Sequence, residues 1–235
     1  MFNWFYNPQE TFNMWDLTHV LTIMFILFIY IVIFIFRFQL KPYRKQIRLF
    51  IGTLLILSRL NLDIWYVLTG TWSVQQALPI ELCSIASLAV GIMLLTKNRF
   101  LFETFYFIGI AGAIQALITP DLLFGFPQFR FLQFFIDHFL LILGPLIMIW
   151  LYAYKITFFS LIKAFLTINL IAAIVFIINL LIDANYMFLI HKPRSTSLLD
   201  ILGPYPYYLI ALEGIVIIVF FILYLPFISK KQCVK

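Results

Sequence analysis

The chain has 235 residues, of which 64% are hydrophobic, 19% aromatic and only 11% charged. Charged residues make up about a quarter of an ordinary soluble domain, so this composition excludes such a domain and places the chain in a lipid bilayer. The net charge of +6 does not indicate nucleic-acid binding, because the basic residues form short clusters between long apolar runs.

Seven apolar runs are long enough to cross a hydrocarbon core of about 30 Å as helices, a length that takes roughly 20 residues. The connections between them are short, and the sequence shows no internal repeat. We therefore predict an all-α, polytopic membrane protein with a single seven-helix domain over residues 1–235. The predicted transmembrane helices are Leu17–Phe36, Leu49–Thr69, Ala77–Thr96, Phe100–Thr119, Phe129–Tyr152, Leu161–Ile182 and Tyr207–Ile228.

The basic residues are distributed unequally between the two sides of these helices. If the N-terminus lies outside, twelve lysines and arginines fall on the inner side, among them Lys230, Lys231 and Lys235 of the C-terminal tail. Only Arg130, Lys192 and Arg194 fall on the outer side, and Arg59 lies within a span. The positive-inside rule therefore predicts an N-terminus outside and a C-terminus in the cytoplasm.

Polar side chains from all seven predicted helices gather in the outer half of the bilayer. A shared depth is typical of a solvated cavity that opens outward, whereas a simple preference of acidic residues for helix ends is the alternative explanation. The residues at this level are His19, Asp63, Cys83, Gln115, His138, Asn179 and Glu213.

Cys83 and His138 form the candidate pair for nucleophilic chemistry. They lie at similar depths in two helices that run in the same direction, so a thiol and an imidazole could meet across the cavity. The imidazole would take the thiol proton, and the thiolate would attack a carbonyl group. The alternative is a small core cysteine and a histidine that bonds to a neighbouring helix.

Two further features carry charge within the spans. Arg59 and Asp63 are four residues apart, so they share a helix face and can neutralise each other; the alternative is that Arg59 holds a headgroup phosphate. Glu213 has no basic residue within a turn. It is therefore protonated, paired with Arg59 or His138, or hydrogen-bonded to Gln115, and beside His138 it would complete a triad-like arrangement.

Several classes of site are excluded or unsupported. A retinal protein needs a Schiff-base lysine in its last span, and Tyr207–Ile228 contains none. The three histidines show no spacing typical of metal ligands, so we expect neither a metal nor another cofactor. Cys83 lies in a span and Cys233 in the tail, so no disulfide is expected.

Five ordered motifs across nearly the whole chain resemble the YwaF-like bacterial integral membrane proteins, which are relatives of the eukaryotic transmembrane protein 164 family. The resemblance implies a multi-pass protein of the bacterial plasma membrane. The motifs are Leu78–Ser84, Gln115–Leu122, Phe129–Phe131 followed by Asp137–His138, Asn185–Leu189 with Lys192–Pro193, and Leu202–Tyr208 through Glu213.

The eukaryotic branch of this family is described as a lipid acyltransferase, and the resemblance implies that Cys83 and His138 carry that chemistry here. Glu81 departs from the histidine that we expect two residues before the cysteine. The remaining residues predicted to bind substrate or support the pair are His19, Arg59, Asp63, Glu81, Gln115, Asp137, Asn179 and Glu213.

The leading hypothesis is a membrane enzyme that transfers or hydrolyses acyl groups of phospholipids in the outer leaflet. Its partners would be membrane lipids and not nucleic acid, and the sequence does not indicate an oligomeric state. A small-solute or proton-coupled transporter with the same polar cavity is the main alternative. A non-catalytic membrane partner is the third hypothesis.

Overall fold

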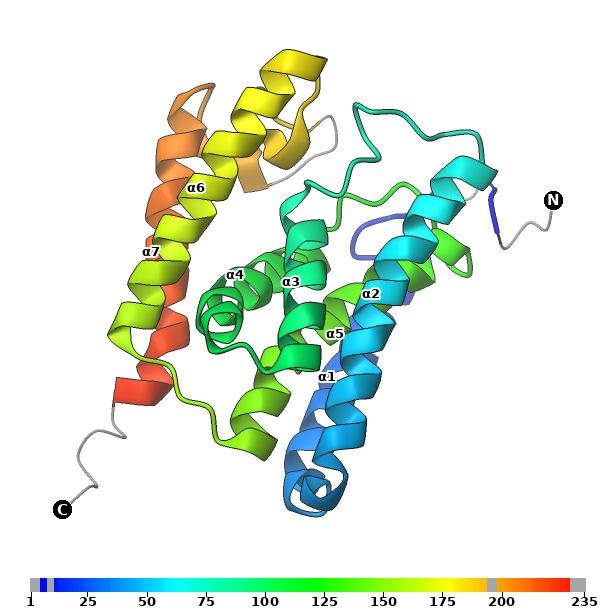
Figure 1. Cartoon of the computed structure of the whole chain (residues 1–235). Coiled ribbons are helices and arrows are strands. Elements are labelled where there is room, and N and C mark those ends of the chain that lie inside the picture. Colours follow the sequence, from blue (N-terminus) through cyan, green and yellow to red (C-terminus); the bar gives the residue numbers. More distant parts are fainter. Residues whose placement is uncertain (1–4, 8–10, 194–197, 229–235) are drawn as a thin grey trace.

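The regular structure of the chain is helical (Figure 1). The computed structural model describes residues 5–7, 11–193 and 198–228, and this part contains seven α-helices and no β-strand. The helices are α1 Leu17–Ile35, α2 Arg44–Leu68, α3 Leu82–Thr96, α4 Arg99–Ile118, α5 Phe129–Tyr152, α6 Phe158–Ile182 and α7 Tyr207–Ile228. The all-α prediction is confirmed, while Arg194 and the tail with Lys230, Lys231, Cys233 and Lys235 lie outside the described residues.

Five of the described helices are long and apolar enough to cross a membrane. They are α1 with the following 3-10 turn (together Leu17–Phe38), α4, α5, α6 and α7. Helix α2 has 25 residues but carries charges both in its first turns and at Arg59 and Asp63. Helix α3 has only 15 residues. It begins five residues later than the predicted span from Ala77, because Pro79 lies in a turn in which the Ile80 amide bonds to the Leu78 carbonyl.

Helices α3, α4 and α5 pack together at the centre, and α2 packs against α3 and α5. The neighbouring helices α6 and α7 lie on one side of this centre and contact it mainly through α4 (Figure 1). Helix α1 lies on the other side, against α5. The arrangement therefore leaves α1, α6 and α7 at the periphery.

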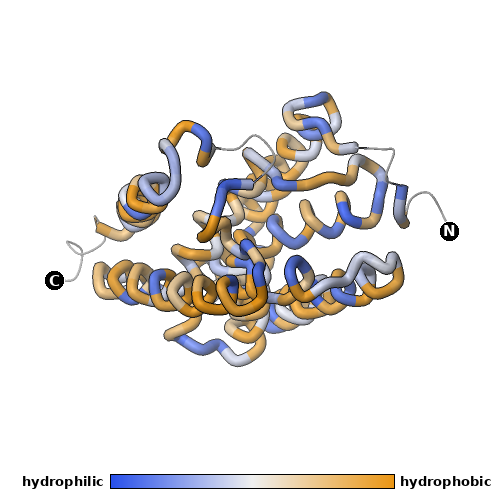
Figure 2. The backbone as a smooth tube through the Cα atoms, turned by 90° about the horizontal axis from the view of Figure 1, so that it is seen from above, coloured by the Kyte–Doolittle hydropathy of each residue, from blue (hydrophilic) through white to orange (hydrophobic). Residues whose placement is uncertain are grey.

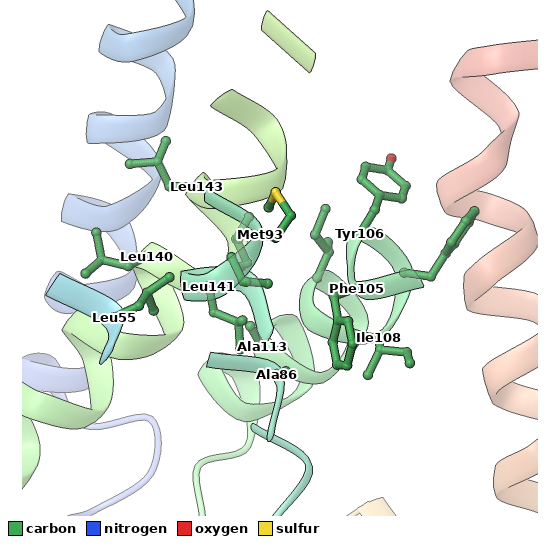
Figure 3. Close-up of a cluster of buried hydrophobic side chains, with 14 of the residues drawn as sticks. Leu55, Ala86, Met93, Phe105, Tyr106, Ile108, Ala113, Leu140, Leu141 and Leu143 are labelled. Atoms are coloured by element: carbon green, nitrogen blue, oxygen red, sulfur yellow. The ribbon is translucent and has the colours of Figure 1, made fainter. Parts of the chain in front are cut away.

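The core is built from aliphatic and aromatic side chains of the four inner helices. Figure 3 shows Leu55 of α2, Met93 of α3, Phe105 of α4 and Leu141 of α5 in this buried cluster. Burial of such side chains from water contributes about 1.5–3 kcal/mol each in a soluble protein. In a bilayer, close packing between helices takes over much of that role.

The outer helices expose apolar surface. In the most hydrophobic stretches of α1 and α6 only 11% of the residues are buried, against 72% in α5. The helices remain largely hydrophobic along their length even where they are exposed (Figure 2). Exposed apolar helices of this length match the surface that lipid chains cover in a membrane.

Candidate functional site

Cys83 lies in the first turn of α3, where Glu81 is the N-cap residue. Glu81 makes no side-chain capping bond to this helix, and its Oε2 instead accepts a hydrogen bond of 3.0 Å from the Met187 amide. The first N–H groups of a helix have no partner within the helix. Within the described part of the chain, the amides of Leu82, Cys83 and Ser84 therefore remain available beside the thiol.

The Cys83 side chain packs against α4 at Gly112. An added Cβ atom at Gly112 would lie 3.9 Å from the Cys83 sulfur. One helical turn away, an added Cβ at Gly109 would lie 3.3 Å from Leu141 of α5. His138 precedes Leu141 by one turn, so it lies on the stripe of α5 that faces α4. Gly112 and His138 are thus each one turn from the Gly109–Leu141 contact, toward the loop that joins α4 and α5.

His138 is buried, and its ring is oriented by its own helix. Its Nδ1 lies 2.7 Å from the Phe134 carbonyl oxygen, and its ring packs on the Phe134 ring with 4.2 Å between centroids. A carbonyl oxygen can only accept a hydrogen bond, so in the neutral ring Nδ1 carries the proton. The lone pair of a neutral imidazole is therefore on Nε2, which has no hydrogen-bond partner among the described residues.

Asp137 links α5 to α3. The Ser87 hydroxyl donates a 2.6 Å hydrogen bond to Asp137 Oδ2, and Ser87 follows Cys83 by one helical turn. The other carboxyl oxygen, Oδ1, is buried without a hydrogen-bond partner in the described structure. Asp137 therefore lies on the α3 side of α5, bonded to a residue one helical turn from Cys83.

No hydrogen bond joins Cys83 and His138 in the described residues. Both side chains face α4 from neighbouring helices, and contact between them remains a prediction. Asp137, next to His138 in the sequence, points about 100° away from it around α5. The structure therefore brings Ser87 and Asp137 into the surroundings of Cys83.

Two segments that are distant in the sequence meet beside the start of α3. The Tyr186 hydroxyl donates to the Val74 carbonyl at 2.8 Å and accepts from the Leu78 amide at 2.9 Å. Asn179 fixes Tyr186, because its side-chain amide bonds to both the N–H and the carbonyl of that residue at 2.9 Å. The segment after α6 is thus tied to the segment before α3, above Cys83.

The profile of the TMEM164 family matches residues 12–224 of the chain, which include Cys83, Asp137 and His138. The chain belongs to the TMEM164 family. No curated protein and no solved structure matches the chain. Family membership and the apolar helices together establish a membrane protein of the TMEM164 family.

In this member of the TMEM164 family, Arg59 and Asp63 form the ion pair that their spacing predicts. An Arg59 terminal nitrogen lies 2.5 Å from Asp63 Oδ1 and also donates to the Ala77 carbonyl at 3.0 Å. Arg59 is 4% exposed, and its Nε has no hydrogen-bond partner in the described structure. The pair therefore fastens the segment before α3 to α2, and Arg59 is not open to a lipid headgroup.

His19 and Gln115 also make local contacts. His19 is fully buried; its Nε2 lies 2.9 Å from the Leu117 carbonyl, and its Nδ1 accepts from the Trp15 amide at 3.0 Å. It links α1 to the end of α4 and does not face a headgroup. Gln115 is exposed and bonds to Thr119 on its own helix.

Glu213 has a partner that the sequence did not indicate. Its Oε2 accepts a 3.2 Å hydrogen bond from Asn169 of α6, so it does not pair with Arg59, His138 or Gln115. Glu213 is therefore not the third member of a triad. Its bond to Asn169 instead joins α7 to α6. Asn169 is one of two asparagines in the apolar run of α6, and this amide was the sequence signal for the contact.

The described residues contain no group of three or more histidine, cysteine, aspartate or glutamate side chains placed to hold a metal ion. Sequence reasoning missed Ser87 and Gly112 as neighbours of Cys83. Small residues spaced along α3 and α4 are the signal that could have found them, because such residues allow close helix contacts in membranes.

Proposed function

We propose that the chain is a membrane-embedded enzyme that transfers or hydrolyses acyl groups of phospholipids, with Cys83 as the nucleophile and His138 as the general base. The observation that carries this proposal is the position of the Cys83 thiol in the uncapped first turn of α3, in contact with Gly112 of α4, the helix against which α5 with His138 also packs. Membership of the TMEM164 family supports it.

The reaction would proceed in two balanced steps. Nε2 of His138 takes the thiol proton, and the thiolate attacks the ester carbonyl of a phospholipid. The tetrahedral intermediate collapses to a thioester on Cys83, and the lysophospholipid leaves with the proton from the imidazolium. The hydroxyl of a second lysophospholipid, or water, then attacks the thioester, gives its proton to His138 and restores the thiol.

The start of α3 would stabilise the charges of this reaction. The uncapped amides around Cys83 present N–H groups and the positive end of the helix dipole at the place where a thiolate forms. The same amides are donors of the kind that bind a developing oxyanion, which is usually a large contribution to catalysis. This arrangement supports a nucleophilic role for Cys83 over that of a core residue.

We further propose that all seven helices cross the membrane, with the N-terminus outside and the C-terminus in the cytoplasm of a bacterial cell. The basic residues near the inner ends of the helices support this orientation. One of them, Lys163 of α6, bonds to Glu103 of α4 at 2.5 Å, and Arg99 bonds to the same carboxylate at 2.9 Å. The reaction would then take place in the outer leaflet, with membrane lipids as substrates.

The proposal is tested with purified protein in vesicles that contain a phospholipid labelled in its acyl chain and an unlabelled lysophospholipid. The expected result is transfer of the label to the lysophospholipid or its release as fatty acid. Cys83→Ser and His138→Gln should abolish both products, and Ser84→Ala should retain them as the matched control on α3. Equal activity in Cys83→Ser and in the wild type would refute the proposal.

A further inference from the structure

The packing of α4 changes abruptly along its length. Every residue from Phe102 to Ile110 is buried, whereas most residues from Ala111 to Ile118 are partly or fully exposed. Ile114 and Ile118 follow Phe107 by seven and eleven residues, so the three share one stripe of the helix. Phe107 is completely buried, while Ile114 and Ile118 are 41% and 42% exposed.

The α6–α7 pair accounts for this difference. Phe107 packs on Phe220 of α7 with 5.3 Å between ring centroids, and the Tyr106 hydroxyl donates to the Leu223 carbonyl at 3.0 Å. Toward the outer end, the packing of α7 on the core extends only as far as Val216. Between positions 209 and 219, no residue of α7 is buried. The pair therefore covers the inner half of α4 and leaves its outer half uncovered.

The uncovered part of α4 reaches the candidate nucleophile. Around the α4 axis, the exposed Gln115 lies between the Ile114–Ile118 stripe and the partly exposed Gly112, which Cys83 contacts. The first turn of α3, including Cys83, is itself only partly buried. We refer to the surface formed by Gly112, Ile114, Gln115 and Ile118 as the outer α4 surface. Cys83 lies at its edge.

The segment after α6 covers the outer end of the outer α4 surface and of Cys83. Met187 and Tyr186 bond to Glu81 and Leu78, so the segment after α6 lies between Cys83 and the outer aqueous phase. The inner end is closed by the Glu103–Lys163 ion pair and by the aromatic contacts of Tyr106. The outer α4 surface is thus closed at both ends along the helix axis. It is open toward the lipid that surrounds the helices in the proposed membrane.

We infer that the outer α4 surface binds one acyl chain of a bilayer phospholipid, which enters sideways between α4 and α7 and brings its ester to Cys83. This inference rests on the proposed function and specifies how its substrate reaches the thiol. The occupant is a lipid chain because the surface is apolar and borders the bilayer. The exposed amide of Gln115, which lies between Ile118 and Gly112 on this surface, matches the polar end of such a chain better than its methyl end.

The test measures access to the Cys83 thiol and does not require turnover. A maleimide attached to an acyl chain is incorporated into vesicles that contain the Cys233→Ser protein, and a short water-soluble maleimide is used in parallel. Ile114→Trp is compared with Ile31→Trp, which places the same side chain on the exposed face of α1, where Ile31 is 58% exposed. Ile118→Trp is the second blocking variant should Ile114→Trp lower the unfolding temperature.

The lipid-borne maleimide should label Cys83, and both α4 variants should slow this reaction severalfold while Ile31→Trp leaves it unchanged. Labelling only by the water-soluble reagent, or equal rates in the α4 variants and the wild type, would overturn the inference. If the labelling pattern is as expected but labelled phospholipid never yields product, the outer α4 surface stands and the proposed enzymatic function fails.

Discussion

Gly112 of α4 and Cys83 of α3 are in contact, and an added Cβ at position 112 would lie 3.9 Å from the Cys83 sulfur. This is an ordinary van der Waals distance, so one methyl group fits there and a branched side chain does not. His138 lies on the stripe of α5 that faces the same helix. Gly112 therefore controls how much space remains beside the sulfur of the proposed nucleophile.

A pair of substitutions at Gly112 tests this spacing. Gly112→Ala should keep the fold and the acyl-transfer rate, since alanine is favoured over glycine in a helix by about 0.5–1 kcal/mol. Gly112→Val should lose most of the activity with little change in the unfolding temperature, because its γ-carbons would reach the sulfur. Activity assays and thermal unfolding in detergent measure both effects, and equal activity of the two variants would show that the spacing is not limiting.

Ser87→Ala should destabilise the protein. It removes the hydrogen-bond donor to Asp137 Oδ2, and the other oxygen of this buried carboxyl already has no partner in the described residues. Leaving a buried polar group unsatisfied costs about 1–3 kcal/mol. Ser84→Ala, on the half-exposed first turn of the same helix, should change stability by less than about 0.5 kcal/mol. Thermal unfolding of the two variants gives the comparison, and equal shifts would argue against a stabilising Ser87–Asp137 bond.

The helices themselves could be predicted well from the sequence. The predicted spans Phe129–Tyr152 and Tyr207–Ile228 coincide with α5 and α7, because Pro, Gly and loop residues bound both runs. The start of α3 was predicted too early, since apolar residues around Pro79 continue the hydrophobic run without helical geometry. Hydropathy records which residues prefer lipid, and it does not record where the backbone leaves the helix.

The candidate site could be predicted only in part. Arg59 and Asp63 were paired correctly because their contact is local to one helix turn. The contact of Glu213 with Asn169 and that of Ser87 with Asp137 join different helices, and they depend on how α6, α7, α3 and α5 are rotated. Depth along each helix can be read from a sequence, but rotation about the helix axis is fixed by packing.

The Arg59–Asp63 pair should be structural. Asp63→Asn would leave the Arg59 guanidinium, which is 4% exposed, without its counter-charge. The cost should be about 1–3 kcal/mol, lower than for a fully buried pair because the Asp63 side chain is 36% exposed. The double variant Arg59→Met with Asp63→Asn should recover part of this loss. Thermal unfolding measures the cycle, and a double variant less stable than Asp63→Asn alone would indicate that the Ala77 contact dominates.

The proposed orientation predicts opposite accessibility of two exposed positions. In a background of Cys83→Ser and Cys233→Ser, Gln76→Cys between α2 and α3 should react with a membrane-impermeant maleimide in intact cells. Lys45→Cys, in the first turn of α2, should react only after the cells are permeabilised. The reverse pattern would place the N-terminus in the cytoplasm and move the candidate site to the inner leaflet.

Intact-protein mass spectrometry tests whether Cys83 is an acyl-accepting nucleophile that His138 activates. Purified protein in vesicles of phospholipid is quenched in acid, weighed, and weighed again after hydroxylamine treatment. This role of Cys83 predicts a mass increase of one acyl group, which hydroxylamine removes, which Cys83→Ser lacks, and which His138→Gln forms far more slowly. An acyl adduct that persists in Cys83→Ser, or none in the wild type under conditions of turnover, would contradict it.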